Sequence, residues 1–215
     1  MDEFGITDGV DVRLTKRIPV AAGMAGGSTD AASMLYGMNQ IFDLGLSRKA
    51  LMERGVKIGA DVPYCLMRGT ALAQGIGEKL SQLPPMVKCP VLIAKPAVSV
   101  STKFVYQNLK LDEHTIHPDI DALIGAIRNK DFTAICGNMA NVLESVTIPN
   151  YPVIAQIKEK MMEAGASHAM MSGSGPTVFG LFEDEEIARH ARDVMKESGL
   201  ARQVYLTSIY NNRRK

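Results

Sequence analysis

The residues best suited to chemistry lie in a glycine-rich stretch, PVAAGMAGGSTDAAS, at residues 19–33. Its glycines, Gly23, Gly26 and Gly27, can adopt backbone angles closed to other residues and let a ligand approach the backbone amides. The hydroxyl and acidic residues at 28–30 then open a helical pattern, whose unpaired N–H groups and positive dipole end favour an anion. The stretch predicts a phosphate-binding loop, although Gly/Ala-rich turns before helices also serve as simple packing devices.

Two familiar nucleotide-binding motifs are excluded for this stretch. No lysine follows its second glycine, as the pattern G-x-x-x-x-G-K-[ST] requires, and it contains no G-x-G-x-x-G. A phosphate bound here would therefore be held in another way, mainly by backbone amides and the start of a helix.

A second candidate is Asp61, which follows a glycine-containing turn and precedes Val62-Pro63. A carboxylate in such a place can orient a hydroxyl group or accept its proton. Aspartate also commonly caps a turn or a helix. The local residues leave both interpretations open.

The cysteines and histidines favour no metal site. Cys65, Cys89 and Cys136 are scattered without C-x-x-C spacing, which is typical of reduced, buried thiols. His114 and His117 are close together, but His117 precedes a proline in a predicted loop, so we do not expect them to bind a metal.

Composition excludes several classes of protein. Among 215 residues, 46% are hydrophobic and 22% are charged, with a formal net charge of +1, so neither disorder nor a basic nucleic-acid surface is indicated. No run of about 18 apolar residues could span a membrane, and the first residues lack the regions of a signal peptide. We therefore expect a cytoplasmic protein that binds neither nucleic acid nor membrane.

The predicted elements would position these candidates as follows. Alternating residues 10–14 predict a strand before the glycine loop, and the helix after the loop carries one apolar face. Further predictions are a helix capped by Ser47, and strands near 64–67 and 70–74. The apolar face of the first helix consists of Ala31, Leu35, Met38 and Phe42.

Three prolines at residues 81–90 indicate a domain boundary, which we place between domains 1–86 and 87–215. The second domain reads as strand, helices, strand, turn, strand, helix and strand. This order predicts an α+β architecture with helices on one face of a sheet. Its expected helices include one in 131–146 and one in 150–164, and its tight turn is SGSGP at 172–176.

Three separated strings resemble the GHMP kinase superfamily. They are the loop at 19–33, GADVPY at 59–64 and MSGSGPTVFGLF at 171–182, which resemble its phosphate loop, its catalytic segment and its carboxy-terminal glycine motif. With KPAVSVST at 95–102 in the same order, the match is closer to one branch. That branch phosphorylates 4-diphosphocytidyl-2-C-methyl-D-erythritol on the way to isoprenoids, and the resemblance runs through essentially the whole chain.

The resemblance implies an α+β, two-domain GHMP-kinase-like fold. Its amino-terminal domain would be like that of ribosomal protein S5, and its carboxy-terminal domain would be a ferredoxin-like α/β sandwich. Members of the family begin with further strands, which carry a lysine that assists the transfer and groups that hold the substrate. Since DEFGIT reads as a helix end with nothing ahead of it, we expect a truncated form with weak or no activity, whose unpaired sheet edge could promote association.

The resemblance also implies a role for particular residues, with ATP and Mg²⁺ as cofactors and the diphosphocytidyl compound as the small-molecule substrate. Asp61 matches the catalytic aspartate, Tyr106 matches an aromatic residue against the cytosine ring, and Ser28 could lie near Mg²⁺. Tyr106 could equally be an ordinary core residue at a helix end, and the turn could be a hairpin without ligand contact. The phosphate loop would comprise Pro19, Val20, Ala21, Ala22, Gly23, Met24, Ala25, Gly26, Gly27, Ser28 and Thr29, and the turn would present Ser172, Gly173, Ser174 and Gly175 to the substrate.

One departure from the family pattern falls inside the loop, where Met24-Ala25 stands in place of the usual Leu-Gly. Alanine is still small enough to keep the loop tight. Two other hypotheses remain open on the sequence alone: a catalytically silent module that binds a nucleotide or sugar, and a GHMP kinase for another small molecule. The oligomeric state is left open.

Overall fold

A computed structural model describes residues 2–16, 18, 22–112, 115 and 117–211. The described residues group into two compact units. The amino-terminal unit draws on 1–20, 25–68 and 73–80, and the carboxy-terminal unit on 21–24, 69–72 and 81–215. The predicted domain boundary between residues 86 and 87 stays a prediction.

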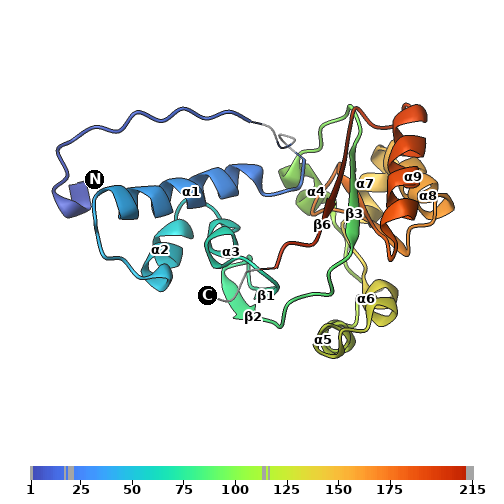
Figure 1. Ribbon diagram of the computed structural model, residues 1–215, viewed down its shortest axis with the longest axis horizontal. Helices are drawn as coiled ribbons and strands as arrows, with labels where there is room; N and C mark the ends of the chain where they lie inside the picture. Colours follow the sequence, from blue (N-terminus) through green and yellow to red (C-terminus); the bar gives the residue numbers. More distant parts are fainter. Residues whose placement is uncertain (1, 17, 19–21, 113–114, 116, 212–215) are drawn as a thin grey trace. The chain divides into compact units, whose positions relative to one another are not determined.

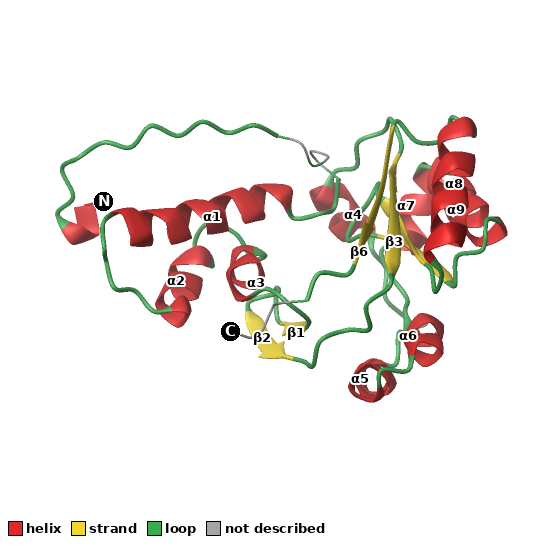
Figure 2. Cartoon of the chain, viewed as in Figure 1, coloured by secondary structure: helices red, strands yellow, loops and turns green. Residues whose placement is uncertain are grey.

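The amino-terminal unit is mainly helical in its described part. Its elements are a 3-10 turn η1 (Asp2–Phe4) and the helices α1 (Gly26–Ile41), α2 (Arg48–Gly55) and α3 (Val62–Met67). Next along the chain is a short hairpin of β1 (Ala71–Gln74) and β2 (Lys79–Gln82), of which residues 73–80 are assigned to this unit, as Figure 2 shows.

A small apolar core holds the three helices of this unit together. Ala32, Leu51, Val62 and Leu66 are buried in it, and Leu35 packs against them from α1, as the predicted apolar face requires.

Hydrogen bonds between residues near in the sequence also stabilise these helices and their connection. The Ser47 hydroxyl accepts a hydrogen bond from Ala50 N at 3.2 Å, and so caps α2 as predicted. Asn39 exchanges two hydrogen bonds with the backbone of Leu46, which fixes the connection between α1 and α2.

Two predicted strands of this unit are wrong. Residues 10–14 form no strand, and Val12 and Leu14 are 57% and 59% exposed, because no described strand pairs with them. Residues 64–67 belong to helix α3. Their short apolar run fits either element, and packing decides for the helix because Val62 and Leu66, one turn apart, share one buried face.

The carboxy-terminal unit is built on a four-stranded antiparallel sheet in the order β4-β5-β3-β6. Its strands are β3 (Pro90–Lys95), β4 (His168–Met171), β5 (Val178–Leu181) and β6 (Gln203–Ser208). Its helices are α4 (Thr102–Asn108), α5 (Ile120–Asn129), α6 (Phe132–Asn138), α7 (Glu144–Asn150), α8 (Val153–Glu163) and α9 (Glu185–Glu197).

Helices α8 and α9 cover one face of this sheet, as Figure 1 shows. Leu92 on β3 is fully buried there with Ile157 of α8 and Met195 of α9, so the alternation along the strand sets which side faces the helices. The prediction of helices on one face only is incomplete. Cys136 of α6 packs with Val91 in a separate cluster that includes alternate residues of β3.

The expected helix at 131–146 is two helices. Helix α6 ends at Asn138, the chain is extended at Met139, and α7 begins only at Glu144. The helix predicted from 150 begins at Val153, because Asn150 ends α7 and its side chain donates to Val146 O at 2.8 Å.

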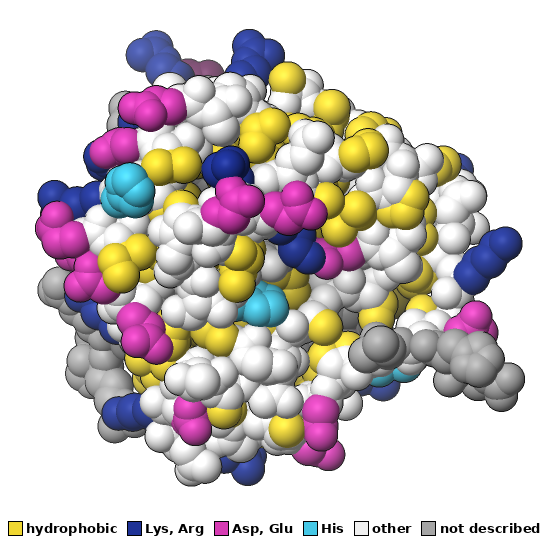
Figure 3. Space-filling model, turned by 90° about the vertical axis from the view of Figure 1, so that its right-hand side faces the viewer, with side chains coloured by type: hydrophobic (Ala, Val, Ile, Leu, Met, Phe, Trp, Pro, Cys, Tyr) yellow, Lys and Arg dark blue, Asp and Glu magenta, His cyan; other side chains and the backbone are white. Residues whose placement is uncertain are grey.

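The outer surface of the carboxy-terminal unit carries charges of both signs. Figure 3 shows acidic and basic side chains interspersed with apolar ones, and on α9 Arg189 pairs with Glu185 one helical turn away at 2.7 Å. Across the described residues, no helix combines the length and the apolar character needed to cross a bilayer.

Candidate active site

The glycine loop leads into α1 in an unusual way. Helix α1 begins at Gly26, two residues before the predicted start, because Ala25 takes the N-cap position with φ 48° and ψ 30°. Alanine has no side-chain oxygen to cap the helix, and no side-chain cap is formed within the described chain. The first N–H groups of a helix have no partner inside it, so this end of α1 suits an anion.

Ser28 and Asp61 lie near one another within the amino-terminal unit. A Cβ built on Gly59, two residues before Asp61, would lie 4.0 Å from Ser28 Oγ. Thr29 Oγ1 of α1 and Cys65 Sγ of α3 are 3.5 Å apart, so the two helices are in contact here. The structure thus brings the start of α1 and the segment around Asp61 together.

The position of Asp61 bears on its two interpretations. Asp61 occupies the N-cap position of α3 and is exposed, but its carboxylate makes no capping hydrogen bond with the described residues of that helix. The glycine of the β1–β2 turn also approaches it, because a Cβ on Gly77 would lie 3.9 Å from Asp61 Oδ1. The carboxylate of Asp61 therefore does not cap the helix, and it is accessible to a hydroxyl group.

Gly23 in the loop and the glycine turn at 172–175 meet inside the carboxy-terminal unit. Ser172 Oγ donates a hydrogen bond to Gly23 O at 2.7 Å. Gly23 has φ 68°, and a Cβ there would lie 2.2 Å from Ser172 O. Such a distance excludes a side chain at Gly23, so this glycine is required both by its backbone angle and by the close approach of the turn.

The turn itself joins β4 and β5, with Met171 paired to Val178, so it is a hairpin connection as one interpretation expected. It is also joined to α4. Thr102 Oγ1 and Ser174 Oγ are 2.9 Å apart, and Ser174 is only 6% exposed. The hydroxyl groups of the turn are thus fixed by Gly23 O and by Thr102, and within the turn only Gly173 is exposed.

Tyr106 lies on α4, which Ser101 caps by accepting from Phe104 N at 3.3 Å. Val105 is fully buried and anchors the helix, whereas Tyr106 is 61% exposed. The interpretation of Tyr106 as a core residue is therefore wrong. Its exposed ring remains available for stacking, which stays a prediction.

Three predicted residues of the loop, Pro19, Val20 and Ala21, lie outside the described residues. Ala22 is 3% exposed and supports the loop from inside the carboxy-terminal unit. Among the described residues, no group of three or more His, Cys, Asp or Glu side chains is arranged to hold a metal ion.

Sequence reasoning missed the side chains that hold the beginning of the glycine turn, chiefly Asn141 and Glu144. The only local signal was the spacing N-x-x-E at 141–144, which resembles a capping box at a helix start. Such a pattern indicates where α7 begins, and it says nothing of a contact 30 residues further along the chain.

With this geometry in place, comparison with known proteins identifies the class. The family model described as "GHMP kinases N terminal domain" matches residues 1–69, and the model described as "GHMP kinases C terminal" matches residues 123–200. The chain belongs to the GHMP kinase family, whose members are ATP-dependent kinases. The resemblance inferred from the motifs and the predicted two-domain α+β fold are confirmed.

Relatives of high identity share one name. The chain is 57% identical to a 4-diphosphocytidyl-2-C-methyl-D-erythritol kinase of Lachnospira eligens, over 97% of this chain and 73% of the relative. It is 53% identical to a kinase of the same name from Lachnoclostridium phytofermentans, over 99% of this chain and 73% of that protein.

Solved structures agree on the fold. A crystal structure of 4-(cytidine 5'-diphospho)-2C-methyl-D-erythritol kinase matches with a TM-score of 0.75 and 28% identity, over 90% of this chain and 68% of that one. A homoserine kinase from Cytophaga hutchinsonii also has a TM-score of 0.75, at 21% identity, over 92% of this chain and 68% of that one. Backbone similarity alone therefore does not separate these substrates.

Proposed function

We propose that this kinase transfers the γ-phosphate of ATP to the 2-hydroxyl group of 4-diphosphocytidyl-2-C-methyl-D-erythritol. In this reaction a bond forms between the hydroxyl oxygen and the γ-phosphorus, the bond to the bridging oxygen breaks, and ADP and a proton leave. The observation that carries the proposal is the 57% identity, over 97% of the chain, to a kinase named for this substrate. No described feature favours a silent binding module or another substrate of the family.

ATP fits the glycine loop for two physical reasons. The start of α1 has no side-chain cap, which leaves amide donors for phosphate oxygens, and a Cβ on Gly27 in the first turn of α1 would meet nothing within 4 Å, so this position is open to approach. We propose that residues 19–29, including Pro19, Val20 and Ala21 outside the described part, bind the triphosphate. Phosphoryl transfer depends mainly on such positioning and on charge stabilisation.

Asp61 is the proposed catalytic residue. Its exposed carboxylate would orient the attacking hydroxyl group and accept its proton late in the reaction, since a carboxylate is a weak base for an alcohol. We propose that Ser28, near the Asp61 segment, contributes to binding Mg²⁺ together with phosphate oxygens. A magnesium ion bound there would neutralise phosphate charge, and its usual oxygen ligands agree with a serine hydroxyl group.

The substrate would be bound from the carboxy-terminal unit. We propose that Tyr106 stacks on the cytosine ring and that Ser172, Gly173, Ser174 and Gly175 contact the substrate near the loop. The exposed ring of Tyr106 and the absence of a Cβ atom at the exposed Gly173 support this assignment. A cytoplasmic location is also proposed, on composition alone.

An ADP-release assay tests the proposal. The diphosphocytidyl substrate, homoserine and mevalonate would be compared, using the chain of 215 residues and a version extended by the first strands of the family. We expect the extended version to release ADP with the diphosphocytidyl substrate only. Turnover of homoserine or mevalonate, or no turnover of the diphosphocytidyl substrate by the extended version, would refute the assignment.

A further inference from the structure

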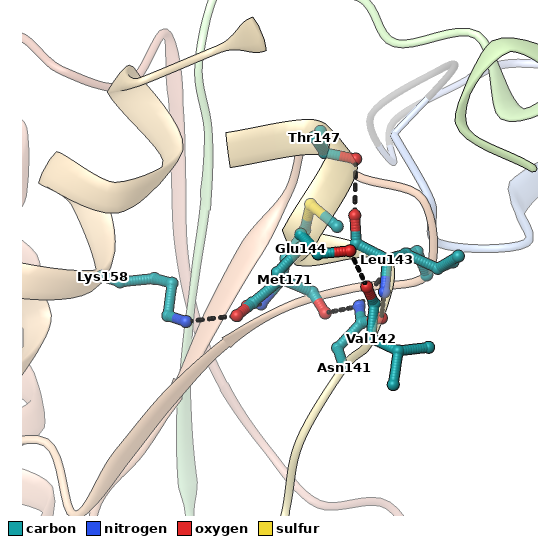
Figure 4. A network of polar contacts seen from close by, with 9 residues as sticks. Asn141, Val142, Leu143, Glu144, Thr147, Lys158 and Met171 are labelled. Carbon is teal, nitrogen blue, oxygen red and sulfur yellow. Dashed lines mark hydrogen bonds and ion pairs between the residues drawn. The ribbon is translucent and has the colours of Figure 1, made fainter. Parts of the chain in front are cut away.

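One amide side chain, Asn141, holds the beginning of the glycine turn. Its Nδ2 donates to Met171 O and to Gly173 O, both at 2.8 Å. Its Oδ1 accepts from Leu143 N at 3.0 Å, which determines which side of the amide faces the turn. Figure 4 shows Asn141 pointing toward Met171 in this network. Both donors of a single side chain are thus used on carbonyl groups of the turn.

The carbonyl group of Ser172 is also engaged. Gly175 N donates to Ser172 O at 2.9 Å. Thr147 Oγ1 lies 3.4 Å from Ser174 O, but its single proton has a nearer acceptor in Leu143 O at 3.1 Å. Every carbonyl group from residue 171 to 173 therefore has a donor from within the carboxy-terminal unit. These acceptors are held inward.

The amide groups at the tip of the turn have the opposite arrangement. No described residue accepts a hydrogen bond from the N–H groups of Gly173 or Ser174. Gly173 has φ 57° and Gly175 has φ 85°, left-handed conformations that turn successive peptide groups over. Gly173 is exposed, whereas Ser174 is only 6% exposed. With the carbonyl groups of residues 171–173 engaged, the exposed tip of the turn presents the N–H group of Gly173, a donor that suits a phosphate oxygen.

A carboxylate supports the same arrangement. Glu144 Oε1 accepts from Met171 N at 2.8 Å, and Glu144 Oε2 pairs with Lys158 Nζ at 2.5 Å, as Figure 4 shows. The side chains of Glu144 and Lys158 are only 17% and 25% exposed, so water competes little for these contacts. The residue that begins the turn is thus held at both its N–H and its C=O.

We propose that Asn141 is a positioning residue for phosphoryl transfer, which keeps the carbonyl groups of Met171 and Gly173 inward and leaves the exposed N–H group of Gly173 available to a phosphate oxygen. The turn contacts the phosphate loop through Ser172 Oγ and Gly23 O. A turn with a reversed peptide group would present a carbonyl oxygen where a donor is needed. The inference rests on the proposed kinase function for its effect on turnover, but not for its effect on the turn itself.

The substitution Asn141→Asp tests this role selectively. Aspartate keeps the acceptor for Leu143 N but places a carboxylate oxygen against Met171 O and Gly173 O, where Asn141 now donates at 2.8 Å. The matched control is Asn138→Asp. Asn138 is also part-buried and donates to one carbonyl, Ala134 O at 2.7 Å, which lies outside the turn.

Kinetics of the extended kinase give the first readout. We expect Asn141→Asp to lower kcat roughly 10- to 100-fold, as loss of about two hydrogen bonds predicts, and to change the KM for ATP less than about threefold. The KM changes little because the loop and the start of α1 are untouched. Asn138→Asp should stay within about twofold of wild type. Wild-type kcat in Asn141→Asp, or an equal loss in Asn138→Asp, overturns the proposal.

Amide hydrogen exchange gives a readout that needs no substrate. We expect faster exchange at residues 171–175 in Asn141→Asp than in wild type or Asn138→Asp, and equal exchange overturns the positioning role. Should the wild-type kinase turn over no substrate, the proposed function fails while this measurement still decides the inference. If Asn141→Asp does not fold, Asn141→Ser, which can donate to one carbonyl, should lose kcat and gain exchange to a smaller extent, and wild-type values would overturn the role.

Discussion

The Asp61 segment and the glycine turn are both expected to contact the reacting groups, yet they are built differently. Asp61 begins a helix of six residues over a core of four buried side chains, and its carboxylate is exposed. The turn at 172–175 joins two strands of a sheet with a much larger buried core, and the carbonyl groups of Met171 and Gly173 are engaged by the side chain of Asn141. One region presents a single functional group, and the other presents a fixed backbone.

Substitutions in these two regions should therefore affect turnover and stability differently. An exposed carboxylate without a capping role contributes little to stability, so its removal should affect turnover alone. A buried backbone turn can change only together with its neighbours, because its partners would be left unsatisfied. The following predictions test this contrast, from the largest expected effect to the smallest.

The largest effect is expected from Asp61→Asn in the extended kinase. We expect kcat to fall about 10²- to 10⁴-fold, the range typical of a lost general base, with a change of less than about 0.5 kcal/mol in the free energy of unfolding. ADP release and urea unfolding measure the two quantities. Asp43→Asn is the control, since Asp43 is exposed, has φ 47°, and asparagine tolerates that conformation. Full turnover by Asp61→Asn would remove the proposed role.

Thiol reactivity compares the two units directly. Burial raises the pKa of Cys89 to about 11 from 9.0, and the neighbouring Cys136 adds to the rise. Burial also raises the pKa of Cys136, and Glu183 adds to it. Cys65 in α3 is partly exposed. Because the thiolate is the reactive form, we expect iodoacetamide at neutral pH to modify Cys65 on the order of 100-fold faster than Cys89.

Mass spectrometry of the labelled protein measures these rates. In guanidinium chloride, where the chain is unfolded, the three thiols should react at similar rates. Equal rates for Cys65 and Cys89 in the folded protein would show that the carboxy-terminal core is no better closed than the amino-terminal unit.

Gly23→Ala should disturb fold and turnover together. The added Cβ would lie 2.2 Å from Ser172 O at a residue with φ 68°, so we expect a loss of about 2–4 kcal/mol in stability and roughly a 10- to 100-fold loss in kcat/KM for ATP. Gly37→Ala is the matched control, because its Cβ would meet nothing within 4 Å in α1. It should keep its activity and gain about 0.5–1 kcal/mol. Equal behaviour of the two variants would contradict the close approach.

The smallest effect concerns the pH dependence of stability. Burial lowers the pKa of His168 below 6.5, the nearby Lys158 lowers it further, and Glu144 opposes them. The unfolded chain therefore binds a proton at a higher pH than the folded one. This contribution to stability is complete above about pH 6.5 and is lost as the pH falls through the lowered pKa.

We expect His168→Gln to weaken this acid dependence in urea unfolding between about pH 5 and pH 8. His190→Gln, at an exposed position on α9, is the control. An unchanged slope in His168→Gln would show that the imidazole beside the Glu144–Lys158 pair contributes nothing to it.

Much of the fold follows from local sequence. The cap Ser47 and the tight turn SGSGP between two strands lie where the patterns predicted them. These features depend on neighbours a few residues away, so a single segment contains the required information. The family is likewise determined by the sequence, because its motifs fall in order at the right separations.

Local patterns failed where distant partners decide. Alternation at 10–14 could not supply a neighbouring strand, and the apolar run at 64–67 became a helix because α1 and α2 offer it one buried face. The site shows the same limit. The sequence motifs singled out the loop, Asp61 and the glycine turn, and the roles of these residues remain proposals.

The sequence by itself determined the family, the glycine loop and the turn that resembles the superfamily's carboxy-terminal motif. Only the tertiary structure decided that Gly23 lies under Ser172 and that Asn141 holds the carbonyl groups of a turn 30 residues away. The physical reason is that backbone orientation in a turn depends on which donors meet it in space. Those donors come from segments that no local pattern connects.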